Sequence, residues 1–178
     1  MELSSGEIMK KIQWIFSFAV AVLQLLSPCA NAEWAKSERE TLKGIESLYV
    51  TIEKLQHDAV EVGLTSNMLR KDVELKLSTA GIKVPFALTG NDEPHLNLII
   101  NVYYDKLNNF VFYNFQISLL QPTILLRNSN LSCYARTWFL STIGSVSKEE
   151  CVKLIRDEIK NKIDTFINDY LAVNPKKP

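Results

Sequence analysis

The chain contains two histidines, and each stands near acidic residues that could join it in acid–base catalysis or in binding a metal. His57 is followed by Asp58 and Glu61, and His95 follows the sequence NDEP. Neither histidine has the paired spacing of a zinc motif such as His-Glu-x-x-His, so a further ligand would have to come from a distant part of the chain. We interpret both segments as solvated loops and expect no metal and no cofactor.

Motifs of other catalytic classes are also missing from the sequence. There is no Gly-x-Ser-x-Gly, and a Ser-His-Asp triad would have to use one of the same two histidines. The six glycines are scattered and form neither Gly-x-Gly-x-x-Gly nor Gly-Lys-Ser/Thr, so nucleotide binding by these motifs is not indicated. A pair of converging carboxylates, as in a glycosidase, has no sequence signature and stays open. We predict that the protein is not an enzyme.

Residues 1–32 have the features of a signal peptide. Lys10 and Lys11 precede an uncharged, apolar run over residues 12–26, which is shorter than the roughly 20 residues that a membrane-spanning helix needs. Ala30-Asn31-Ala32 then has the small-x-small form that signal peptidase accepts. We expect cleavage after Ala32, a periplasmic or secreted protein, and no stable membrane insertion after cleavage.

Two alternatives for the N-terminal segment stay open. Glu2 and Glu7 would offset the positive charge that should precede the apolar run, so translation could instead start at Met9. Cys29 could carry a lipid, although a bacterial lipobox has Gly, Ala or Ser directly before the cysteine and Pro28 stands there.

The charges of the chain balance, with 20 Lys and Arg against 20 Asp and Glu. Residues 1–32 contain two lysines and two glutamates, so the mature chain is neutral as well. Proteins that bind nucleic acid or acidic membranes usually carry a basic excess or stripe. Both classes are therefore disfavoured, and the mature chain is long enough for one domain with its own core.

We predict a single domain over residues 45–173, between a flexible lead-in at 33–44 and a tail at 174–178. Alternation of apolar and polar residues indicates strands at 45–55, 96–105, 110–120 and 132–143, and Pro85 confines a short strand at 82–86 to an edge. The apolar residues expected on one side of the central hairpin are Leu96, Leu98, Ile100, Val102, Val111, Tyr113, Phe115, Ile117 and Leu119.

Two amphipathic helices complete the predicted domain. Thr65 and Gly81 mark the ends of the first, and Ser147 with Glu150 forms a capping box for the second. Each helix needs a surface on which to pack, which predicts an α+β fold: a two-layer sandwich of a mostly antiparallel sheet with both helices on one face. The apolar side of the last helix is expected to contain Cys151, Ile155, Ile159, Ile163, Phe166, Tyr170 and Leu171.

The two cysteines of the mature chain are predicted to be unpaired. Cys133 lies near the start of the last strand, and Cys151 lies in the first turn of the helix after that strand. A strand of this length separates its ends by roughly 30 Å, whereas a disulfide needs Cα atoms within about 7 Å. We expect Cys151 to be buried.

The stretch from about Leu42 to Pro175 contains ESLYVTIEKL, TSNMLRKDVELKLSTAGIKV, TWFLSTIGSV and FINDYLAVNPK, and it resembles a group of small exported bacterial proteins usually left as uncharacterised. Its topology is also similar to that of the amino-terminal domain of TolB and of CsgG-like periplasmic domains, which are envelope-assembly and interaction modules. The first resemblance implies no known chemistry. The second is an analogy of fold and does not by itself imply a function.

The sheet face opposite the helices is the most informative feature for function. Strand alternation places on it Asn101, Tyr103, Phe112, Asn114, Gln116, Tyr134, Arg136 and Trp138. Aromatic residues and arginine are enriched where proteins contact partners, although strand propensity alone also favours aromatic residues. The predicted partner face consists of Tyr103, Phe112, Gln116, Arg136 and Trp138.

These observations predict an exported, non-enzymatic protein of the cell envelope that binds an unknown envelope protein or component through the open face of its sheet. A first alternative is a small-molecule carrier or sensor with a pocket between sheet and helices. A second is a hydrolase that uses His57 or His95 with nearby acids.

Overall fold

The computed structural model describes residues 36–86 and 93–175. The chain divides into two compact units, Met1–Ser37 and Glu38–Pro178, and every element named below belongs to the second. The predicted signal peptide, with Met9, Cys29 and Ala32, lies outside the described residues. Among the described residues, no helix combines the length and apolar character that crossing a bilayer requires.

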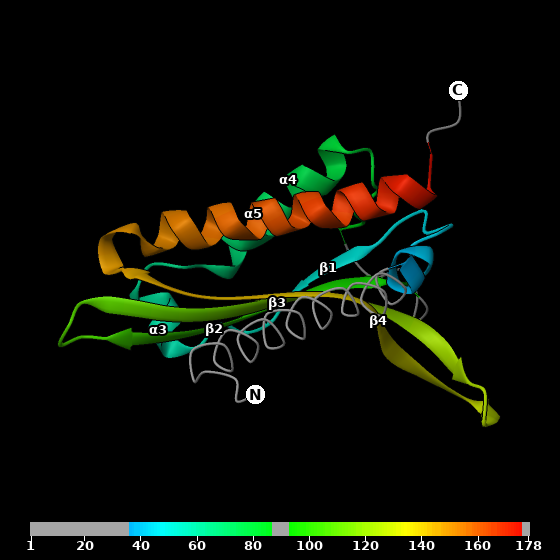
Figure 1. Cartoon of the computed structure of the whole chain (residues 1–178), viewed down its shortest axis with the longest axis horizontal. Helices are drawn as coiled ribbons and strands as arrows, with labels where there is room; N and C mark the ends of the chain where they lie inside the picture. The colour runs from blue at the N-terminus through cyan, green and yellow to red at the C-terminus, as the bar shows by residue number, and fades with distance from the viewer. Residues whose placement is uncertain (1–35, 87–92, 176–178) are drawn as a thin grey trace, which may run out of the picture. The chain divides into compact units, whose positions relative to one another are not determined.

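The described strands form a four-stranded mixed sheet in the order β1-β2-β3-β4 (Figure 1). The strands are β1 Tyr49–Ile52, β2 His95–Asp105, β3 Phe110–Leu125 and β4 Asn128–Ser147. β1 pairs parallel with β2, and the two remaining pairs are antiparallel. All nine residues predicted for the inner side of the β2–β3 hairpin are buried. In the predicted strand at 82–86, Lys83 makes an isolated bridge to Ser47.

The helices are α3 His57–Glu61, α4 Ser66–Thr79 and α5 Lys148–Val173, and α4 and α5 cover the same face of the sheet (Figure 1). The predicted α+β fold is therefore confirmed. At the start of α4, the Thr65 hydroxyl accepts a hydrogen bond from the Met68 N–H, and Gly81 with φ of 87° follows its end. Ser147 stands at the N-cap of α5, but its side chain makes no capping hydrogen bond, so the predicted capping box is not formed.

The core lies between the sheet and the two long helices. Phe166 of α5 packs against Trp138 of β4 with ring centroids 4.9 Å apart, and Phe115 of β3 is fully buried. Leu42, in the segment expected to be a lead-in, is also fully buried. Asn174 fixes this segment to the end of α5, because its amide donates to the Leu42 carbonyl at 2.9 Å.

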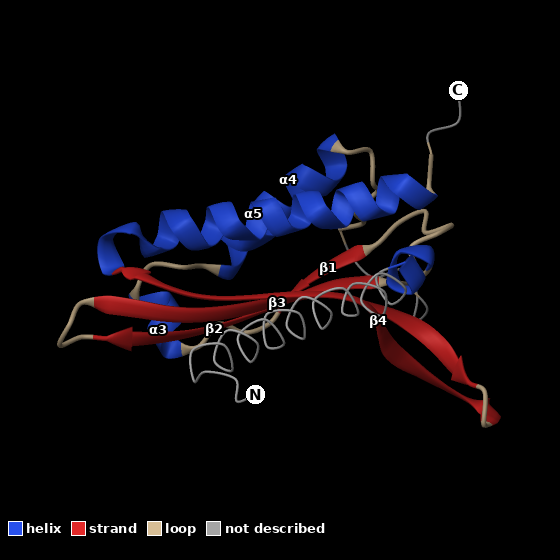
Figure 2. Cartoon of the chain, in the orientation of Figure 1, coloured by secondary structure: helices blue, strands red, loops and turns tan. Residues whose placement is uncertain are grey.

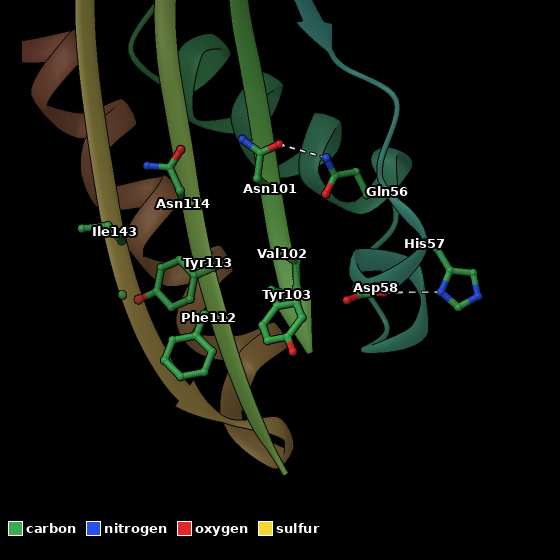
Figure 3. A pocket seen from close by; sticks show the side chains of 11 residues that line it. Gln56, His57, Asp58, Asn101, Val102, Tyr103, Phe112, Tyr113, Asn114 and Ile143 are labelled. Carbon is green, nitrogen blue, oxygen red and sulfur yellow. Dashed lines mark hydrogen bonds and ion pairs between the residues drawn. The ribbon is translucent and has the colours of Figure 1, made fainter. Parts of the chain in front are cut away.

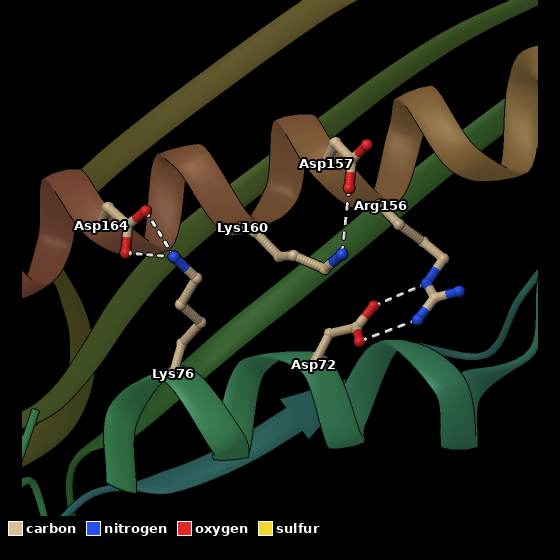
Figure 4. A network of polar contacts seen from close by, with 6 residues as sticks. All are labelled: Asp72, Lys76, Arg156, Asp157, Lys160 and Asp164. Carbon is tan, nitrogen blue, oxygen red and sulfur yellow. Dashed lines mark hydrogen bonds and ion pairs between the residues drawn. The ribbon is translucent and has the colours of Figure 1, made fainter. Parts of the chain in front are cut away.

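Ion pairs join α4 to α5 on the outside of the helical layer (Figure 4). Arg156 donates two hydrogen bonds to the Asp72 carboxylate, at 2.7 and 2.9 Å. One turn further along α4 from Asp72, Lys76 donates to both carboxylate oxygens of Asp164 in α5, at 2.7 and 2.6 Å. The Arg156 guanidinium holds the pKa of Asp72 below its ordinary value. The charged residues between the two helices therefore hold α4 and α5 together.

A bulge divides β4 into two parts. Trp138 pairs with Leu119 and Arg136 pairs with Leu120, so Thr137 is an extra residue on β4. Its hydroxyl accepts a hydrogen bond from the Gln121 amide at 2.7 Å, and its carbonyl accepts one from the Thr41 hydroxyl at 3.2 Å. Because side chains alternate along a strand, one extra residue reverses the faces of all residues beyond it.

Beyond Leu120, β3 has no partner in β2, which begins at His95. Residues 121–125 and 128–135 therefore form a two-stranded arm at one end of the sheet (Figure 2). Cys133 lies exposed on this arm, whereas Cys151 is buried in the first turn of α5, and both thiols are free as predicted.

Candidate functional site

We name the sheet face opposite α4 and α5 the open face. Three large apolar side chains from adjacent strands are exposed on it: Tyr103 of β2 at 64%, Phe112 of β3 at 48% and Ile143 of β4 at 83%. Tyr103 and Phe112 are cross-strand partners with ring centroids 6.3 Å apart. We refer to these three residues as the apolar cluster.

The apolar cluster lines an open hollow of about 550 Å³ between α3 and strands β2 to β4 (Figure 3). Amide side chains stand at its border, above the apolar cluster in the view of Figure 3. Gln56 Nε2 donates to Asn101 Oδ1 at 3.2 Å, and Asn114 Nδ2 donates to the Thr142 carbonyl at 3.0 Å. Apart from His57 and Asp58 of α3, the described residues that line the hollow are uncharged. The site can therefore offer apolar contact and amide hydrogen bonds.

α3 forms one wall of the hollow and is held against the end of β2 by its acidic residues. Asp58 Oδ2 accepts a hydrogen bond from the Tyr104 N–H at 3.0 Å, and Glu61 forms an ion pair with Lys106 at 2.6 Å. The Tyr104 N–H lowers the pKa of Asp58, and Glu61 raises the pKa of Lys106. The segment that we interpreted as a polar loop is thus a helical turn anchored to the sheet.

His57, Asp58 and Glu61 come together as the sequence suggested they could, with ligand atoms within 4.8 Å of one another. His57 Nδ1 lies 3.5 Å from an oxygen of each carboxylate. The other oxygen of each acid already binds Tyr104 or Lys106. In Figure 3 the exposed His57 ring points away from the apolar cluster. The contacts of these acids fit a role in anchoring α3.

His95 is the first residue of β2, and our interpretation of it as a loop residue was wrong. Its ring packs edge-on against Tyr134 and Tyr49, at centroid distances of 5.1 and 6.0 Å. α3 contacts the opposite end of β2, near Tyr104, which is about 30 Å away along the strand. The two histidines therefore do not share a site.

The five residues predicted for the partner face do not all lie on one face of the sheet. Tyr103 and Phe112 are exposed on the open face, Gln116 is half-buried there, and the Arg136 guanidinium lies 4.1 Å from the centre of the Phe139 ring. The prediction that Trp138 lies on the open face was wrong. It is 3% exposed on the helix-covered face, where its Nε1 donates to Asp169 at 3.1 Å. The bulge at Thr137 is the reason.

Sequence reasoning missed Ile143 and Gln56. With uninterrupted alternation along β4 and Trp138 on the open face, Ile143 would lie on the helix-covered face. The extra residue at the bulge places Ile143 on the open face instead. Nothing in the residues around Thr137 marks the bulge. Gln56 reaches the site because α3 folds back over β2, a tertiary contact with no local sequence signal.

No family model and no curated protein sequence matches this chain. A solved structure of a minor lipoprotein from Acinetobacter baumannii aligns with 76% of this chain and 98% of its own, at 11% identity and a TM-score of 0.43. This similarity is too low to establish a shared function. The resemblances to small exported bacterial proteins and to TolB and CsgG-like domains stay predictions.

Proposed function

We propose that this chain is an exported, non-enzymatic protein of the cell envelope that binds another protein through the open face of its sheet. The observation that carries the proposal is the apolar cluster, because Tyr103, Phe112 and Ile143 are exposed together around one hollow. Contact surfaces commonly have an apolar centre with aromatic anchors and a polar rim. The apolar cluster and the amides of Gln56, Asn101 and Asn114 match that pattern.

The character of the partner follows from the charge of the surface. The described residues of β2 to β4 that line the hollow are uncharged, so long-range electrostatic attraction contributes little there. A partner segment with apolar side chains at its centre and hydrogen-bonding groups at its edges would satisfy both the cluster and the amides. We expect binding that changes little with salt concentration.

A second candidate function is the binding of a small apolar molecule in the same hollow, whose volume lies within the range of ligand sites, about 300–1,000 Å³. The space between sheet and helices is instead occupied by core side chains such as Phe115, Ile159 and Phe166. A carrier or sensor would therefore use the open face and not the interior that we first expected.

Affinity capture of the tagged protein from the envelope fraction of its own host tests the proposal. The double variant Phe112→Ser/Ile143→Ser should lose at least about tenfold of the captured partner, since hot-spot residues carry most of the binding energy. A matched control, Leu75→Ser/Leu126→Ser, removes two exposed apolar side chains elsewhere and should capture as the wild type does. Circular dichroism establishes that all three proteins are folded.

Equal capture by the wild type and the open-face variant would refute the proposal. A co-purified small molecule that only the open-face variant loses would favour the second candidate. Intact-mass measurement of the exported protein also shows whether it begins at Glu33, as we predict, or carries a lipid on Cys29.

A further inference from the structure

β4 is an edge strand, and its outer edge has no neighbouring strand within residues 36–86 and 93–175. After the bulge, residues 138–147 pair with β3 without interruption, from Trp138 opposite Leu119 to Ser147 opposite Phe110. A regular edge of this kind presents a row of backbone N–H and C=O groups to which another strand can bind.

Edge strands of soluble proteins are usually protected against such pairing by lysine, proline, inward-pointing charges or bulges. Residues 138–147, WFLSTIGSVS, contain neither a charged residue nor a proline. The irregularity of β4 in this region, at Thr137, lies before the segment and leaves it regular. Ile143, near its middle, is 83% exposed. The segment is therefore suited to strand pairing.

A second copy of this chain is the occupant that the charges favour. The chain carries a formal net charge of zero, so identical copies do not repel each other as copies of a charged protein would. Two antiparallel copies of one edge strand, related by a two-fold axis, also offer each other the same groups. We propose that the protein forms a homodimer by antiparallel pairing of β4 with β4, centred on Ile143.

The register follows from the faces of the sheet. Directly opposed residues of an antiparallel pair point to the same face, so a continuous sheet must be centred on a residue and not between two residues. Centring on Ile143 places the two exposed isoleucines opposite each other. It also places Leu140 opposite Val146, Thr142 opposite Gly144 and Ser141 opposite Ser145, so within three residues of the centre apolar residues meet apolar ones and small residues meet small ones, while Phe139 faces Ser147 further out.

The dimer joins two four-stranded sheets into one of eight strands. Both helical layers lie on one side of it, and both apolar clusters lie on the other, with Ile143 of each copy at the centre. The open faces thus become one surface with two equivalent sites. Ile143 belongs both to the apolar cluster and to the centre of this dimer, but the pairing is made by the backbone groups of the β4 edge and does not require the proposed function.

Sedimentation velocity of the protein expressed from the full chain tests the proposal, with substitutions at two exposed serines. Under two-fold symmetry about Ile143, position 141 of one copy faces position 145 of the other. Ser141→Lys/Ser145→Lys should therefore raise the dimer dissociation constant about tenfold or more, because it sets lysine opposite lysine twice. Ser141→Lys/Ser145→Glu should dimerise at least as tightly as the wild type, because it sets lysine opposite glutamate twice.

Mixing Ser141→Lys/Ser145→Lys with Ser141→Glu/Ser145→Glu should restore dimers that contain one chain of each. Circular dichroism checks that each variant is folded, and the Lys/Glu variant is a control for changes at the same two positions. A wild type that sediments as a monomer at all accessible concentrations would overturn the proposal, and would leave the edge to a strand from another protein. A dimer that both double variants weaken equally, or that neither changes, would also overturn it.

Discussion

The two faces of the sheet are built from alternating residues of the same strands but differ in the burial of their side chains. Tyr113 and Phe115 lie on the helix-covered face with stacked rings, whereas Tyr103 and Phe112 lie exposed on the open face. Burial raises the pKa of Tyr113 to about 12, and its hydroxyl lies in the space that a Cβ at Gly144 would occupy. Aromatic residues on one face thus fill a core, and those on the other remain available to a partner.

Residue type alone therefore does not tell a core aromatic from an exposed one. Trp138 and Ile143 show it most clearly, because the tryptophan is buried and the isoleucine is exposed. Judged by residue type alone, the tryptophan would be the one expected on a partner face, since tryptophan is common in hot spots. Their faces are set by the register of β4, which the bulge at Thr137 determines.

The largest expected effect separates Trp138 from Phe112. Trp138→Ala should lower the free energy of unfolding by about 3–5 kcal/mol, because it leaves a cavity against Phe166 and removes the hydrogen bond to Asp169. Phe112→Ala should cost less than about 1 kcal/mol, because its side chain is half exposed. Urea denaturation measures both values. Similar losses for the two variants would contradict the assignment of faces.

Most of the fold could be predicted because the central strands alternate without interruption. In β2 and β3 the expected inner residues, such as Leu98 and Ile117, are buried. The face of α5 that carries Cys151, Ile155 and Ile159 is buried as expected, since helical spacing places these residues on one side. Local sequence patterns suffice wherever an element is regular.

The candidate site could be predicted only in part, because it depends on irregular backbone and on distant contacts. Tyr103 and Phe112 lie in regular strands and were placed correctly. Trp138 was misplaced because one extra residue, Thr137, reverses the alternation. α3 was taken for a loop because its single turn is stabilised by a hydrogen bond and an ion pair to β2, which no local pattern reveals.

The ion pair between Asp72 of α4 and Arg156 of α5 should contribute to the stability of the folded protein. Asp72 is 13% exposed at its side chain and accepts two hydrogen bonds from Arg156. Asp72→Asn should therefore lower the free energy of unfolding by about 1–2 kcal/mol at neutral pH. Asp157→Asn, which removes the partner of Lys160 in an exposed pair within α5, is the control and should cost less than about 0.5 kcal/mol.

The dependence of this effect on pH follows from the lowered pKa of Asp72 in the folded protein. Its stabilising effect is fully present above the pKa of an aspartate in the unfolded chain, about 3.9, and is lost as the pH falls through the lower folded value. The difference between the wild type and Asp72→Asn should therefore shrink below about pH 4. A difference that stayed constant down to lower pH would mean that packing, and not charge, accounts for it.

The smallest expected change in unfolding free energy concerns the N-caps of the two helices that cover the sheet. Thr65 accepts a hydrogen bond from the Met68 N–H at the start of α4, whereas Ser147 makes no capping hydrogen bond at the start of α5. Thr65→Ala should cost about 1 kcal/mol of unfolding free energy, the usual loss for a formed N-cap, and Ser147→Ala only a few tenths. Thermal and urea unfolding of the two single variants measure the difference. A loss at Ser147 equal to that at Thr65 would indicate that the capping box predicted with Glu150 forms in solution.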